Sequence, residues 1–300
     1  MITLDIPPTT HVPVLLNQVI SALQPQPGKR FIDCTVGLGG HASAILERIS
    51  PGGKLLGIDM DPEAIAISRA NLEYHGEAVI LVNDSFANIE NICDELDFHP
   101  VDGILFDLGV SSLQLDTARR GFSFQREAPL DMRFDTDQGL TASDLVNTLC
   151  EQELARILRE YGEERYSRKV AHRIVQNRPI TTTLKLARVV RQVLGGKHTR
   201  IHPATRTFMA LRIAVNDELD NLKAALNQTT NLLRPGGRLV IISYHSLEDR
   251  IVKQFMRREA DGESPTLKLI SSKVIRPTSL EIESNPRSRS AKLRIAERLS

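Results

Sequence analysis

The stretch at residues 31–43, FIDCTVGLGGHAS, could hold a nucleotide-containing cofactor against its backbone. An apolar, strand-like start runs into a cluster of glycines, and from Gly37 the cluster reads G-x-G-x-x-A. Glycines with this spacing let the backbone approach a ligand closely. Asp59 lies 22 residues after Gly37 and could accept hydrogen bonds from both hydroxyls of a ribose. These features fit a nicotinamide dinucleotide as well as an adenosyl cofactor, and they also occur in tight turns without a ligand.

Acidic residues stand at the carboxyl ends of successive predicted strands. Asp33 lies at the end of the first strand, and Asp59, Asp84 and Asp107 end or follow the next three. In an open parallel sheet the ligand crevice lies outside these ends. Carboxylates there would repel a pyrophosphate and attract a molecule that carries ammonium and sulfonium charges. The acids therefore favour S-adenosylmethionine over a nicotinamide dinucleotide.

The elements that must position these residues are apolar, β-rich segments at nearly constant intervals. Their centres at Phe31, Leu55, Val79 and Ile104 are separated by 24, 24 and 25 residues, with amphipathic stretches between them. This alternation is typical of βαβ units, in which crossover helices join the strands of a parallel sheet.

The regular spacing stops after Ile104. The next convincing strand is RLVIIS at 238–243, and its centre lies 136 residues after Ile104. One crossover helix, predicted over 217–233 and ended by Arg-Pro-Gly-Gly, uses only a small part of this gap. This turn followed by a strand is common in S-adenosylmethionine-dependent methyltransferases. The rest of the gap reads as helices and predicts an insertion, and 267–274 and 291–298 would supply the last two strands.

Charge is distributed unevenly along the chain. The formal net charge is +1, but residues 1–150 carry −12, residues 151–212 carry +9 and residues 213–300 carry +4. A basic segment of this kind indicates contact with a polyanion, although solvated helix faces would give the same composition.

Two predicted helices in the basic segment, at 163–178 and 183–194, carry cations on one face. Tyr166, Val170 and Ile174 recur every four residues and are expected to pack inward. Exposed lysine and arginine contact phosphates mainly as charge, without reading the base sequence. The candidates for RNA binding are Arg165, Lys169, Arg173, Arg188, Arg191 and Arg206.

Composition argues against several other classes of protein. The first residues contain neither a basic nor an apolar signal region, and no apolar run approaches the ~18 residues that span a bilayer. Cys34, Cys93 and Cys150 lie far apart without a C-x-x-C motif, so no metal site and no disulfide are expected. A cytoplasmic protein with reduced thiols and no membrane contact is the expectation.

Beyond these general features, a series of motifs resembles the bacterial 16S rRNA cytosine-N4 methyltransferase family. They run in order from about His11 to Arg298. The resemblance implies an α/β fold of the class I, Rossmann-like methyltransferase type, with a seven-stranded, mostly parallel sheet and an inserted all-helical domain. It implies a core of residues 1–115 and 214–300 and an RNA-recognising helical domain of residues 116–213. The motifs are HVPVLLNQVI, DCTVGLGGHAS, GIDMDP, DLGVSSLQLD, RGFSF, LDMRFD, HPATRTFMALRIAVNDEL, LRPGGRLVIISYHSLEDRIVK and NPRSRSAKLRIAER.

The resemblance also implies an activity and a set of site residues. The protein would use S-adenosylmethionine to methylate the N4 amine of one cytidine in 16S rRNA, within the small ribosomal subunit near the decoding centre. Asp107 is the first candidate to accept a proton from the amine, and Tyr244 and His245 are candidates to contact the base. The implied cofactor contacts are Gly39, Gly40, His41, Asp59, Phe86, Asp107 and Gln114, and Asp33, Gly37 and Asp84 join them as further candidates.

Each of these residues could also have a purely structural role. His41 could simply begin a helix, Phe86 could belong to the core, Gln114 could be an ordinary loop residue, and Tyr244 with His245 could form a structural corner. At the level of function, the alternatives are a nicotinamide-dependent oxidoreductase, a non-enzymatic ribosome-assembly factor, and a methyltransferase of DNA or small molecules. The oligomeric state and the order of the loop at 195–200 without RNA stay open.

Overall fold

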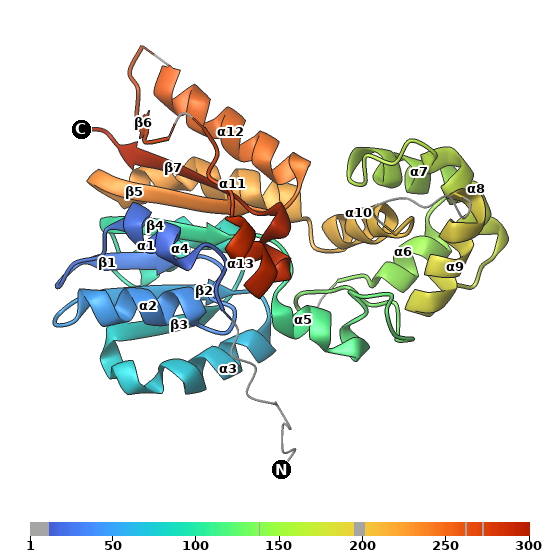
Figure 1. Cartoon of the computed structure of the whole chain (residues 1–300), viewed down its shortest axis with the longest axis horizontal. Helices are drawn as coiled ribbons and strands as arrows, with labels where there is room; N and C mark the ends of the chain where they lie inside the picture. Colours follow the sequence, from blue (N-terminus) through green and yellow to red (C-terminus); the bar gives the residue numbers. More distant parts are fainter. Residues whose placement is uncertain (1–11, 138, 195–201, 262, 272) are drawn as a thin grey trace. The chain divides into compact units, whose positions relative to one another are not determined.

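The computed structural model describes residues 12–137, 139–194, 202–261, 263–271 and 273–300, so His11 and the loop at 195–200 lie outside the described residues. The chain divides into two compact units (Figure 1). The first unit comprises Met1–Gly109 and Lys223–Ser300, and the second comprises Val110–Leu222. The domain boundaries expected after residues 115 and 213 both fall within the second unit.

A seven-stranded sheet forms the centre of the first unit, in the order β3-β2-β1-β4-β5-β7-β6. The first five strands pair in parallel, and β7 runs antiparallel to both β5 and β6. This arrangement confirms the expected α/β fold class. The strands are β1 (Arg30–Asp33), β2 (Lys54–Asp59), β3 (Val79–Asn83), β4 (Val101–Asp107), β5 (Leu233–Ser243), β6 (Leu267–Leu269) and β7 (Lys292–Arg298).

The central strands are apolar because the sheet buries both of their faces. In β4, Ile104, Leu105 and Phe106 are consecutive and all fully buried. Crossover helices cover the sheet, and α12 lies beside β6 and β7 (Figure 1). The α-helices that lie wholly within this unit are α1 (Leu16–Leu23), α2 (Gly40–Ile49), α3 (Pro62–Leu72), α4 (Ile89–Glu95), α12 (Ser246–Asp261) and α13 (Ser279–Ser284). Short 3₁₀ helices in this unit are η1 (Glu73–Ala78), η2 (Phe86–Asn88) and η4 (Pro286–Ser290).

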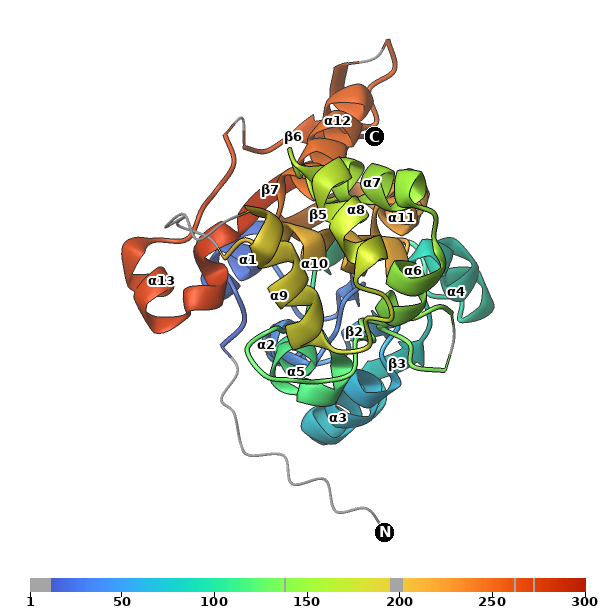
Figure 2. The same ribbon diagram turned by 90° about the vertical axis from the view of Figure 1, so that its right-hand side faces the viewer.

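The second unit is helical and has its own apolar core. Leu154, Val170, Ile174, Leu186 and Val190 are among the fully buried side chains of that core. Figure 2 shows α8 beside both α7 and α9. Its helices are α5 (Ser112–Asp116), η3 (Ala118–Arg120), α6 (Ala142–Thr148), α7 (Glu151–Glu160), α8 (Ser167–Gln176), α9 (Thr183–Leu194) and α10 (Thr205–Val215), and the division between the units falls within α11 (Glu218–Leu232).

The helix expected over 163–178 begins later than the sequence pattern suggests. Glu163 has a positive φ of 47°, and α8 starts only at Ser167. The prediction that Tyr166 packs inward is therefore wrong: Tyr166 precedes the helix and is 55% exposed. Glu164 is buried instead, and its carboxylate accepts a hydrogen bond from the Tyr166 backbone N–H at 2.8 Å.

No helix within the described residues is long and apolar enough to cross a membrane.

Candidate active site

The glycine turn between β1 and α2 depends on residues that lack a side chain. Gly37 and Gly39 have φ values of +52° and +87°, a region that residues with a side chain rarely adopt. A Cβ on Gly39 would lie 3.1 Å from the Leu72 side chain, and one on Gly40 would lie 2.6 Å from Cγ of Pro13. The turn is thus packed tightly from two sides.

Pro13 is itself held in place by the C-terminal part of the chain. The Leu15 backbone N–H donates a hydrogen bond of 2.6 Å to Oε1 of Glu281 in α13, and the Asn285 side chain donates one of 3.0 Å to the carbonyl of Val12. Residues from both ends of the described chain therefore support the glycine turn.

Asp59 ties the end of β2 to this turn. Its Oδ2 accepts a hydrogen bond from the Gly37 backbone N–H, and its Oδ1 accepts one from the Asp61 backbone N–H, both at 2.9 Å. The expected contact of Asp59 with a ribose stays a prediction.

Asp33 is an almost fully buried carboxyl group at the end of β1. Its side chain is 1% exposed, and Oδ1 accepts a hydrogen bond from the Thr35 backbone N–H at 3.2 Å. The pKa of Asp33 is raised to about 7, mainly by burial and also by the nearby carboxylates of Asp107 and Asp59, against the opposing hydrogen bond from Thr35. Three acids from three strand ends therefore interact electrostatically, as their placement in the sequence suggested.

Asp107 ends β4 and lies between several groups of the site. The Tyr244 hydroxyl donates a hydrogen bond of 2.8 Å to its Oδ1, and Nε2 of the buried His41 lies 3.9 Å from its Oδ2. The Asp107 side chain is 24% exposed. Desolvation nevertheless raises the pKa of Asp107 to about 7, opposed by the hydrogen bond from Tyr244 and assisted by the charge of Glu248.

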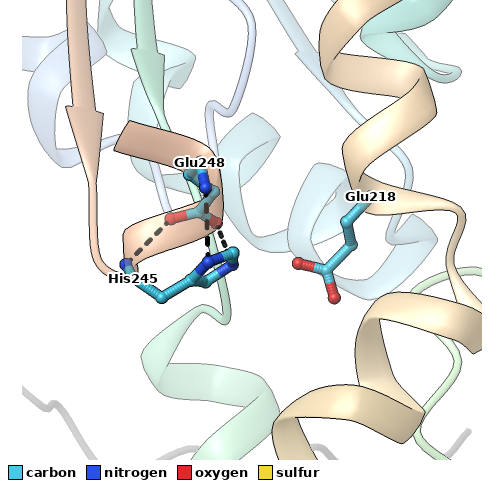
Figure 3. Close-up of side chains that lie close together, drawn as sticks. All are labelled: Glu218, His245 and Glu248. Atoms are coloured by element: carbon cyan, nitrogen blue, oxygen red, sulfur yellow. Dashed lines mark hydrogen bonds and ion pairs between the residues drawn. The ribbon is translucent and has the colours of Figure 1, made fainter. Parts of the chain in front are cut away.

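The turn after β5 is fixed by Glu248, which the sequence analysis did not single out. Glu248 is 2% exposed, and its Oε2 accepts hydrogen bonds from the backbone N–H groups of Tyr244 and His245, at 2.8 and 3.2 Å. Its Oε1 lies 3.0 Å from Nε2 of His245 (Figure 3). An acid three residues after His245, at the start of a helix, is the capping-box spacing that could have identified it. Tyr244 and His245 thus do form a structural corner, and that corner directs Tyr244 to Asp107.

Tyr244, held by Glu248, orients the Asp107 carboxylate, which can act as a proton acceptor. Burial and the neighbouring carboxylates raise the pKa of Tyr244 well above its ordinary value, so its phenol stays protonated and donates to Asp107. A carboxylate with a pKa near neutrality accepts a proton more readily than an ordinary aspartate does. His41 lies near the start of α2, as the alternative interpretation expected, and also approaches Asp107; its contact with the cofactor stays a prediction.

The other candidate cofactor residues have local partners. Phe86 is partly exposed and makes an edge-to-face contact with Phe106, at 5.6 Å between ring centroids. Asp84 accepts hydrogen bonds from the Ser85 backbone N–H and the Asn88 amide. Gln114 belongs to the second unit, where it forms a capping box with Ser111 at the start of α5. The cofactor contacts expected of these residues stay predictions.

The six candidates for RNA binding are all exposed in the second unit: Arg165, Lys169, Arg173, Arg188, Arg191 and Arg206. Cys34, Cys93 and Cys150 are free thiols.

Comparison with known proteins gives matches along almost the whole chain. The model of a family described as the MraW methylase family matches residues 8–299. The protein named Ribosomal RNA small subunit methyltransferase H from Dehalococcoides mccartyi is 54% identical over 302 residues, which cover 96% of this chain and 86% of that protein. Proteins with the same name from Syntrophotalea carbinolica and Thermomicrobium roseum are 52% and 50% identical, covering 96% and 97% of this chain and 98% and 94% of their own.

Proposed function

The chain belongs to the MraW methylase family, and from this membership we propose that it methylates the N4 amine of one cytidine in small-subunit rRNA, with S-adenosylmethionine as the methyl donor. The observation that carries the proposal is the agreement with rRNA methyltransferases over 96% of the chain. The geometry of the first unit supports it, because the groups this reaction requires meet at the carboxyl ends of the strands.

The acids fit a cationic methyl donor. When bound, S-adenosylmethionine supplies an electrophilic methyl group on a positively charged sulfur. Asp33 and Asp107 both have pKa values raised to about 7 by burial and by neighbouring carboxylates, and a cation nearby would relieve that repulsion. Asp59 would hold the ribose, Phe86 would pack near the adenine, and the backbone at 39–41 would approach the methionine portion.

The chemical difficulty lies with the cytidine amine. Its lone pair is delocalised into the ring, so the nitrogen attacks poorly unless an acceptor holds its protons. The Tyr244 hydroxyl fixes Oδ1 of Asp107, and the Asp107 carboxylate would accept the proton that N4 loses as the new carbon–nitrogen bond forms. Methyl transfer also requires an in-line approach, with reacting atoms about 3–3.5 Å apart.

The cytidine must leave any base pair or stack to reach such a pocket. We propose that the exposed cations of the second unit hold the surrounding RNA, which in the cell would be 16S rRNA near the decoding centre of the small ribosomal subunit, in the cytoplasm. The charge of residues 151–212 within that unit supports this assignment, since this segment carries a net +9.

Mass-spectrometric mapping of the nucleosides of small-subunit rRNA, with and without the protein, tests the function. An N4-methylated cytidine at one position, present only with the protein and S-adenosylmethionine, is the expected result. Titration with NADH tests the oxidoreductase alternative, and methyl transfer to DNA or to free nucleosides tests the other methyltransferases. A protein that transfers no methyl group to rRNA or subunits would overturn the proposal.

A further inference from the structure

A groove of about 450 Å³ opens to solvent between α8 and α9 of the second unit. Figure 2 shows these two helices side by side. Two of the lining residues, Lys169 and Arg173, are candidates for RNA binding from the sequence. The groove is lined by Arg168, Lys169, His172, Arg173, Gln176, Gln192 and Val193.

The lysine and arginine side chains of the groove are not neutralised by acids within the described residues. Arg168 and Lys169 are exposed and form no ion pair there, and Arg173 donates only to the neutral Gln192, at 3.1 Å. His172 is oriented from both sides: Nδ1 lies 2.9 Å from a Glu151 carboxylate oxygen, and the Gln176 amide lies 2.9 Å from Nε2. A set of donors without an acidic lining is suited to an anion, and arginine with lysine is the usual combination for phosphate.

An exposed aromatic ring adjoins this groove. Tyr166 is 55% exposed, and Nζ of Lys169 lies 6.0 Å from the centre of its ring. Lys169 therefore connects the ring to the groove, because its side chain contacts both. Aromatic rings beside cations are the arrangement by which proteins bind single-stranded nucleic acid: the base stacks on the ring and the cations hold the backbone.

We propose that this groove binds a backbone phosphate of a single-stranded RNA segment, and that a neighbouring base stacks on Tyr166. The proposal rests on the proposed function and deepens it, because it specifies the RNA conformation and the residues that hold it. A single strand is required because the bases of a duplex are stacked on one another and offer no free face. Among the described residues that line the groove, the one ring is the His172 imidazole, and both of its nitrogens face Glu151 and Gln176. A phosphate contact alone does not select a base.

The experiment compares two double variants of the full-length protein. R168E/K169E reverses two charges in the groove, and K253E/R257E reverses two exposed charges on α12 of the first unit as a matched control. Binding to a single-stranded oligonucleotide of small-subunit rRNA is measured from about 50 to 200 mM KCl. We expect R168E/K169E to bind about 10-fold or more weakly at low salt and to lower the salt slope by about 0.7 for each phosphate that it no longer neutralises. We expect K253E/R257E to resemble the wild type.

The stacking contact is tested separately with Tyr166. We expect Y166A to weaken binding to the single strand about 5- to 100-fold, whereas Y166F keeps the ring and binds normally. Binding to a duplex of the same sequence should not distinguish these two variants. Equal binding of Y166A and Y166F to the single strand would overturn the stacking contact. Equal salt slopes of R168E/K169E and K253E/R257E would overturn the phosphate contact.

Two further measurements separate this inference from the proposed function. Calorimetric binding of S-adenosylmethionine verifies that each variant is folded, and methylation of small subunits by the wild type tests the function itself. If the wild type methylates rRNA while the groove variants bind RNA like the control, only the groove assignment fails. If the wild type transfers no methyl group, the proposed function fails whatever the binding data show.

Discussion

The Tyr244 hydroxyl donates a hydrogen bond of 2.8 Å to Oδ1 of Asp107, and this contact joins the residue that ends β4 to the residue that follows β5. The two strands are neighbours in the parallel part of the sheet, so their carboxyl ends emerge at the same edge. The phenol therefore fixes the orientation of the carboxylate on which the proposed proton transfer depends.

Replacing Asp107 by Asn should reduce turnover strongly. The amide keeps the size of the side chain but cannot take up a proton, and general base catalysis typically contributes about 100- to 10,000-fold. Transfer of labelled methyl groups to small subunits measures the loss, and calorimetry with S-adenosylmethionine shows whether cofactor binding survives. Turnover within a few-fold of the wild type would remove Asp107 from the mechanism.

Replacing Tyr244 by Phe should move the acidic limb of the pH–rate profile to higher pH. The hydrogen bond from Tyr244 lowers the pKa of Asp107 in opposition to burial, so its removal raises that pKa further above about 7. The carboxylate form would then predominate only at more alkaline pH. Turnover measured from pH 6 to pH 10 should recover at the alkaline end, and an unshifted limb would contradict the role of the phenol.

Replacing Glu248 by Gln should move the acidic limb of the pH–rate profile to lower pH. The negative charge of Glu248 raises the pKa of Asp107, so a neutral amide lowers it. The carbonyl oxygen of the substituted side chain can still accept from the turn backbone, whereas Glu248→Ala removes that support as well. The Glu248→Gln variant should therefore shift the acidic limb to lower pH with modest loss of maximal turnover, and the Glu248→Ala variant should lose turnover at every pH.

Replacing Asp33 by Asn should stabilise the free protein at pH 8 and weaken cofactor binding. The pKa of Asp33 is 3.8 in a model compound and about 7 in the folded chain. The folded state therefore holds this proton more tightly, so stability falls as pH rises from about 4 to 7 and stays reduced above that. The Asn variant removes this penalty, which is on the order of a few kcal/mol. Thermal unfolding at pH 5 and pH 8 should show a gain in Tm mainly at pH 8.

A pair of glycine substitutions separates backbone strain from cofactor binding. Gly39 and Gly28 have similar positive φ values of 87° and 78°, but only a Cβ on Gly39 meets a neighbour, the Leu72 side chain. Alanine at Gly28 should cost about 1–2 kcal/mol of stability, and alanine at Gly39 should cost more because its Cβ presses on Leu72. Only Gly39→Ala should also reduce affinity for S-adenosylmethionine. Equal affinity of both variants for the cofactor would exclude the turn at Gly39 from the binding site.

The sheet could be predicted well from the sequence because the signals of its strands are local and recur along the chain. Buried parallel strands need continuous apolar runs, and crossover helices of similar length impose the spacing from Phe31 to Ile104. The last strands were harder to delimit. Within the described residues of the expected 267–274, β6 covers Leu267–Leu269, and Ile270 adds one backbone hydrogen bond to Ile295 of β7. A short edge strand has one neighbour and a weak apolar pattern.

Two features of the structure were not predicted correctly from the sequence: the start of α8 and the role of Glu248. The four-residue repeat was extended back to Tyr166, but the positive φ of Glu163 delays the start of α8 and leaves that ring exposed. Glu248 was overlooked because its role lies in backbone contacts within a turn, although its spacing from His245 at the start of a helix is that of a capping box. The acids at the strand ends could be predicted as a group, whereas the donors that orient them could not.

The support of Gly40 by Pro13, and of the neighbouring Leu15 by Glu281, has a consequence for biosynthesis. Glu281 lies in α13, which leaves the translating ribosome long after the glycine turn itself. A growing chain can form its early strands first, whereas the contact of Glu281 with Leu15 forms only after α13 has emerged.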